Sequence, residues 1–93
     1  MNETLSAHEL KRSHNVLRFD FVVVELDLAI TFCEIALSAE TDTKARRNTA
    51  HAHHAYSAAM RFLEGATLTK LMDLEINQKI QRLGGMLESL DRG

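Results

Sequence analysis

Hydrophobic residues recur along most of the chain at helical spacing. Between residues 17 and 39, placing residues about 100° apart gathers the apolar side chains on two separate faces. The first face holds Phe19, Val22, Val23, Leu26, Ile30, Cys33 and Leu37, and the second holds Phe21, Val24, Leu28, Phe32 and Ile35. This long periodic pattern favours a helix over the strand that the β-branched run at 22–24 would suggest.

The segment before this helix, residues 1–15, permits two interpretations. Ser6 and Glu9 match a capping box, which predicts a helix beginning at Ala7. Asn15 has the chemistry to cap a second helix that begins at Val16. Alternatively, one helix runs through the whole segment, because no residue here forbids continuity.

Cap chemistry at residues 41–43 separates this region from a second predicted helix, residues 43–64. Its inner face is rich in alanine, which lets another helix approach closely: Ala45, Thr49, Ala52, Ala55, Tyr56, Ala59, Met60, Phe62 and Leu63. Gly65 is expected to end the helix in a left-handed conformation. The cations Lys44, Arg46 and Arg47 near the start are expected to pair with acidic residues of a neighbouring helix or partner chain.

A third helix is predicted over residues 68–89, capped by Thr67 or Thr69. Its apolar stripe comprises Met72, Ile76, Ile80, Leu83, Leu87 and Leu90. Gly84 and Gly85 weaken this helix, but the stripe stays in phase across them, so continuation is expected rather than a break.

Short links between three long helices predict an all-α, antiparallel up-down-up three-helix bundle. The 93 residues form a single domain, and the absence of proline fits long helices and few loops. The short N-terminal helix would be an addition to this bundle. The expected core comprises Leu26, Ile30, Cys33, Tyr56, Leu63, Ile76, Ile80 and Leu83.

Charge and composition narrow the expected partners. A net charge of −2 does not provide the basic field that nucleic-acid binding requires. The apolar run at 19–37 carries four carboxylates, which argues against a membrane span: Asp20, Glu25, Asp27 and Glu34. A single cysteine and a polar start without a signal peptide predict a cytoplasmic protein.

The histidines of the second helix are the main candidates for chemistry. His51 and His54 are three residues apart, so they could share a divalent metal on one helix face. Further ligands, such as His8 or His14, have no defining spacing, and Arg47 and Arg61 would repel a cation. We therefore expect no metal site, no cofactor and no catalytic residues. Glu25, between the two apolar faces, is expected to fix the helix register or to reach solvent rather than act as an acid or base.

Ala52, Tyr56, Ala59 and Phe62 of the second helix resemble the second helix of a tetratricopeptide repeat or of a microtubule-interacting-and-transport domain. Both families are peptide-binding scaffolds, so the resemblance implies a helical or peptide partner. It covers about a dozen residues and assigns no functional residue. As a whole, the chain looks like a small helical protein of bacteria.

The second apolar face of the first helix is the main functional signal. A bundle helix needs one stripe for its neighbours, and Phe21, Val24, Leu28, Phe32 and Ile35 form another. We expect a non-enzymatic interaction module that forms a homodimer or higher oligomer through these residues. The competing explanation is an N-terminal helix with Leu5 and Leu10 that folds back over the face. Two other functions remain open: a metal- or ligand-binding protein that uses His51 and His54, and a subunit of a larger enzyme or regulatory complex.

Overall fold

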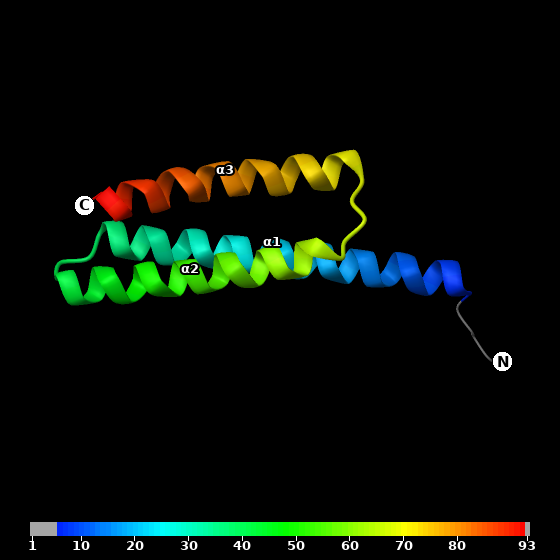
Figure 1. The fold of residues 1–93 in the computed structure, drawn as a ribbon, viewed down its shortest axis with the longest axis horizontal. Helices are drawn as coiled ribbons and strands as arrows, with labels where there is room; N and C mark the ends of the chain where they lie inside the picture. Colours follow the sequence, from blue (N-terminus) through cyan, green and yellow to red (C-terminus); the bar gives the residue numbers. More distant parts are fainter. Residues whose placement is uncertain (1–5, 93) are drawn as a thin grey trace.

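The computed structural model describes residues 6–92, which form α1 (Ala7–Leu37), α2 (Asp42–Glu64) and α3 (Lys70–Arg92). The chain direction alternates between successive helices, and α1 packs against both α2 and α3 (Figure 1). The predicted all-α, up-down-up bundle is confirmed. Among the helices of residues 6–92, none has the length and apolar character needed to cross a membrane.

Residues 7–15 of the N-terminal segment and the first predicted helix form one continuous helix. The Ser6 hydroxyl accepts a hydrogen bond from the Glu9 backbone N–H and donates one to the Glu9 carboxylate, each at 3.1 Å. Asn15 starts no second helix; its Oδ1 instead accepts from the Thr67 backbone N–H at 3.3 Å. Among the described residues, no separate helix folds back, and Leu10 lies on α1 itself; Leu5 lies outside them.

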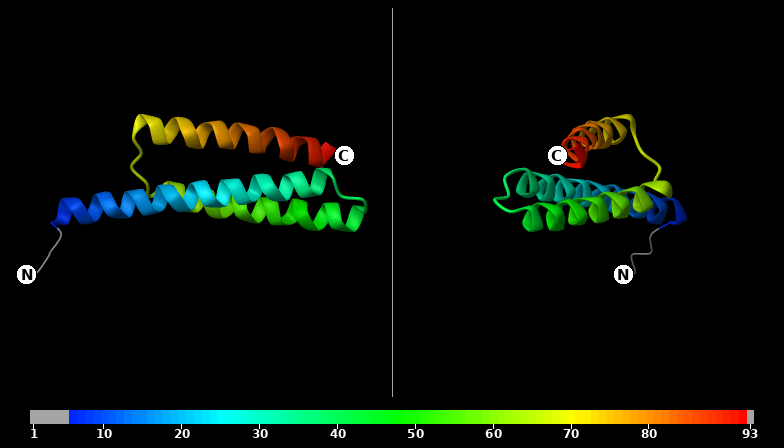
Figure 2. Two further views of the ribbon diagram at one scale, coloured as in Figure 1. Left: turned by 180° about the vertical axis from the view of Figure 1, so that it is seen from behind. Right: turned by 60° about the vertical axis from the view of Figure 1, so that its left-hand side comes forward.

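The interface between α1 and α2 is built from small side chains. Ala52, Ala55 and Ala59 of α2 are buried, as is Ala29 of α1. With little bulk between them the two helix backbones can approach closely, so α2 runs side by side with α1 in each view of the bundle (Figure 2). Asn48 is the buried polar residue of this interface, and its amide donates to the Lys44 carbonyl at 2.9 Å.

Most of the predicted core is confirmed. Leu26, Ile30, Cys33, Ile76 and Leu83 are buried in one cluster. The other three predicted residues, Tyr56, Leu63 and Ile80, are only partly buried and pack against its edge. Val22, Leu87 and three alanines of α2 with Ala29 of α1, which the predicted core does not include, complete the cluster.

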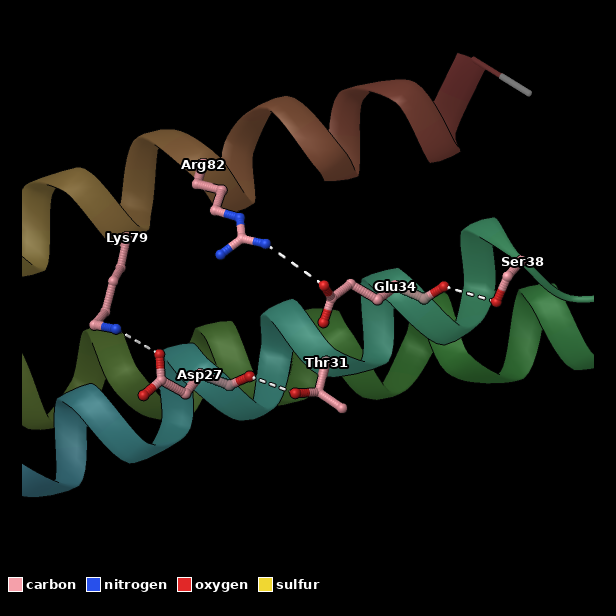
Figure 3. Close-up of polar contacts among 6 residues, drawn as sticks. All are labelled: Asp27, Thr31, Glu34, Ser38, Lys79 and Arg82. Carbon is pink, nitrogen blue, oxygen red and sulfur yellow. Dashed lines mark hydrogen bonds and ion pairs between the residues drawn. The ribbon is translucent and has the colours of Figure 1, made fainter.

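Ion pairs connect α3 to the polar side of α1 (Figure 3). The Lys79 ammonium lies 2.6 Å from the Asp27 carboxylate, and the Arg82 guanidinium lies 3.5 Å from that of Glu34. Among residues 6–92, these carboxylates therefore pair with α3 and not with the cations that open α2. Exposed pairs of this kind contribute about 0–1 kcal/mol each, so they fix the position of α3 more than they stabilise the fold.

The expected left-handed cap at Gly65 is wrong, because its φ is −98°. A Cβ atom at this position would lie 2.9 Å from a guanidinium nitrogen of Arg18. The absence of a side chain thus makes room for Arg18, which donates to the Phe62 carbonyl at 3.3 Å. Thr69, one of the two predicted caps, begins α3 by accepting from the Met72 backbone N–H at 3.2 Å.

The glycine pair of α3 offers a stabilising substitution. Gly84 and Gly85 lie within an uninterrupted helix, as expected, and a methyl group at either position would meet no atom within 4 Å outside the local helix backbone. Neither residue has a positive φ. Replacing both with alanine should raise the free energy of unfolding by up to about 1 kcal/mol each. Urea denaturation checks this, and destabilisation by either substitution would contradict it.

Candidate functional site

One side of α1 is left uncovered by the other two helices. Phe21, Val24, Leu28 and Ile35 are exposed there, with Val24 60% exposed. Because α1 is continuous, the same side extends to Leu17 and Leu10, which are also exposed large hydrophobic residues. Four of the five predicted interface residues therefore lie on an uncovered surface that is longer than predicted.

Successive residues on this surface are separated along the sequence by four and three positions in alternation. We call them the α1 seam: Leu10, His14, Leu17, Phe21, Val24, Leu28, Thr31 and Ile35. Every seam residue is exposed. A repeat of 3.5 residues is the spacing at which two helices pack along a shared line, as in a coiled coil. The seam thus has the pattern of a helix that packs against another helix.

Phe32, the fifth predicted interface residue, has a different role. It is partly buried, packs against the core cluster, and has its ring centroid 5.0 Å from that of His51. At the other end of the same edge, Phe21 stacks on Phe62 with ring centroids 5.1 Å apart. These two aromatic contacts join α1 to α2 at the border of the α1 seam.

An open groove between α1 and α2 runs beside the α1 seam. Its lining is mainly apolar and comprises Glu25, Leu28, Phe32, His51, His54, Ala55 and Ala58. Glu25 is partly buried here and, among the described residues, makes no ion pair within 4 Å. The groove therefore presents an apolar floor with one carboxylate and two imidazoles at its rim.

The candidate metal ligands do not assemble into a site. His51 and His54 are both exposed, and His51 is in contact with the Phe32 ring. His53 points elsewhere, with Nε2 3.7 Å from the Asp91 carboxylate. Within residues 6–92, apart from His8, whose side chain lies outside the described part, no three His, Cys, Asp or Glu side chains are grouped closely enough to hold a metal ion.

Zinc binding should accordingly be weak. Two exposed histidines supply half of a tetrahedral ligand set, so calorimetry should show no binding tighter than about micromolar. The matched control is the His51→Ala, His54→Ala variant, which should give the same titration. A nanomolar signal with proton release that disappears in this variant would show a metal site.

Cys33 behaves as a buried apolar residue. It is fully buried and free. Desolvation raises the pKa of its thiol, and the negative charges of Asp91 and Glu34 raise it further. Since the thiolate is the reactive form, Cys33 is a poor nucleophile in the folded protein.

The first two turns of α1 extend beyond the rest of the bundle (Figures 1 and 2). The loop between α2 and α3 contacts α1 at Asn15 and Arg18. Residues 7–14 lie beyond those contacts, and we call them the arm. Leu10 and His14 of the α1 seam belong to it. The arm is the N-terminal end of α1, and a helix end frays unless a neighbour packs on it.

Comparison with known proteins identifies no relative that could indicate an activity. No family model matches the chain, and neither a curated protein nor a solved structure matches it. The α1 seam, the arm and the groove between α1 and α2 are therefore the features from which a function can be inferred.

Proposed function

We propose that the protein is a self-associating helical interaction module, and that the α1 seam binds a second copy of the chain. The observation that supports this is an exposed line of apolar residues with coiled-coil spacing, running from Leu10 to Ile35. Such a line on a water-exposed helix is unfavourable unless another helix covers it. Burying a leucine, valine or phenylalanine completely contributes about 1.5–3 kcal/mol.

The protein exposes more surface than a compact monomer of the same mass. The protein has a solvent-accessible surface of 6713 Å², whereas a compact monomer of 10.5 kDa has about 5,400 Å². Its dimensions of 59 × 26 × 17 Å are those of an elongated molecule. A standard interface buries about 800 Å² on each partner, which the excess exceeds.

Light scattering after size-exclusion chromatography tests the proposal. At tens of micromolar the mass should be at least twice the 10.5 kDa of the chain. Val24→Asp combined with Leu28→Asp should give a monomer, because two carboxylates would be buried against apolar side chains. Helicity should largely persist, since neither residue is in the buried core.

The matched control places the same two charges on another surface. Gln78 and Gln81 of α3 are exposed and lie off the α1 seam, so Gln78→Asp with Gln81→Asp should leave the mass unchanged. A monomeric parent protein would refute self-association. An unchanged mass in the Val24→Asp, Leu28→Asp variant would show that the interface lies elsewhere.

The groove between α1 and α2 favours a second candidate function, which is binding of a helical or peptide partner. Its apolar floor, formed by Leu28, Phe32 and Ala58, could accept an amphipathic helix. This candidate agrees with the peptide-binding role that the resemblance of α2 implies. It becomes the leading one if the parent protein is monomeric.

A further inference from the structure

We propose that the two copies pair with their α1 helices antiparallel, so that the arm of each lies along the C-terminal half of the other copy's α1. The antiparallel pairing rests on the proposed self-association and adds its orientation and register. In this register the residue numbers of facing seam positions add up to 45. The two-fold axis then passes between Val22 and Val23.

The order of apolar and polar residues along the α1 seam is the same in both directions. Leu10 faces Ile35 of the second copy, Leu17 faces Leu28, and Phe21 faces Val24. The two polar seam residues, His14 and Thr31, also face each other. A polar residue in a helix seam fixes register because any shift would place it against an apolar side chain. If one α1 is shifted by seven residues along the other, His14 faces Val24 of the second copy. A shift of seven residues in the opposite direction places Thr31 against Phe21 of the second copy.

The charges beside the α1 seam favour the same orientation. On the side nearest α2, the antiparallel register places Arg18 opposite Glu25 of the second copy, and the two-fold axis repeats this pair. Glu25, which has no ion-pair partner among the described residues, thereby gains one. In a parallel pair, Glu25 would instead lie near Asp20 of the second copy, with two repulsive contacts.

The opposite side contains the one unfavourable feature of the antiparallel register. There Asp20 approaches Asp27 of the second copy. Lys79 already neutralises Asp27, with its Nζ 2.6 Å from the carboxylate. The repulsion is therefore reduced on this side, whereas the favourable pair of Arg18 and Glu25 is retained.

The arm favours the antiparallel pair for an independent reason. In a parallel pair the two arms would contact only each other, beyond the ends of both bundles, where no third helix holds either helix end in place. In the antiparallel pair each arm packs on the C-terminal half of the other copy's α1, which is held in place by α2 and α3 of that other copy. Leu10 and His14 of the arm then cover Ile35 and Thr31.

Thiol crosslinking between seam positions distinguishes the orientations. In a Cys33→Ala background, we would prepare Leu17→Cys and Leu28→Cys separately and treat each, and their mixture, with a short bifunctional thiol reagent. In the antiparallel pair the two copies of residue 17 lie about 16 Å apart along the axis, so only the mixture should give a covalent dimer. A parallel pair would crosslink each variant with itself and refute the proposal.

Light scattering on the same background separates failure of the orientation from failure of self-association. A monomeric background protein would remove the proposed function and the antiparallel pairing together. A dimer that no combination crosslinks would refute the antiparallel pairing in this register and leave self-association standing. Leu74→Cys, exposed on α3 and off the α1 seam, is the control that should not crosslink with residue 17.

A charge reversal provides a second test by a different measurement. Glu25→Lys should raise the dimer dissociation constant on the order of tenfold, because it places a cation opposite Arg18 twice. Adding Arg18→Glu to the same chain should restore most of the affinity. Tighter association of the Glu25→Lys variant would indicate the parallel pair and refute the antiparallel one.

Discussion

Leu26→Ala should lower the free energy of unfolding by about 2–5 kcal/mol, which is a large part of the stability of a domain of this size. Leu26 is fully buried at the centre of the cluster that all three helices share. Removing three carbons there leaves a cavity, because the helices around it are held in place by other contacts. Urea denaturation followed by circular dichroism measures the change at a fixed protein concentration, since association would contribute to stability.

Alanine substitutions at one isoleucine and one further leucine serve as comparisons for this result. Ile80→Ala should cost less than Leu26→Ala, because Ile80 is only partly buried at the edge of the cluster. Leu71→Ala should have little effect, because Leu71 is 78% exposed. Equal losses at Leu26 and Leu71 would contradict the placement of the core.

Ala52→Leu should destabilise the protein by about 1–3 kcal/mol for the opposite reason. Ala52 is fully buried where α2 packs against the core, so a larger side chain would push the helices apart. Thermal denaturation should show a lower melting temperature. Ala50→Leu, two residues away on the exposed side of α2, is the matched control and should leave it nearly unchanged. A stabilised Ala52→Leu variant would indicate an unfilled space between α1 and α2.

The helices and the bundle were predictable from the sequence because apolar residues repeat with a clear helical period. The continuity of α1 was not, since Asn15 has the chemistry of a cap. What decides its role is the loop at Thr67, which lies 52 residues away along the sequence and so leaves no sign in the local pattern. The burial of the core alanines was also hard to predict, because whether a small residue is buried depends on how closely a neighbouring helix approaches.

The candidate surface was partly predictable. Four of the expected interface residues are exposed, but the predicted face lacks Leu10, which precedes the predicted helix, and Leu17, which is its first residue. Counting in steps of 3.5 residues finds both of them. Phe32 lies at the border between the uncovered side and the side facing α2, and its contact with His51 depends on the register between those helices.

The position of Cys33 has a consequence for measuring motion. Leu83 and Leu87 of α3 belong to the same cluster as Cys33, and α3 is joined to α1 partly by exposed ion pairs and contains two adjacent glycines. Local opening of a protein begins with its least stably packed element, which here is α3. The only thiol of the chain therefore becomes accessible when α3 swings away. The rate at which Cys33 is alkylated should therefore report how often α3 separates from α1. This rate should increase with salt concentration, because salt screens Lys79 and Arg82 from their carboxylates.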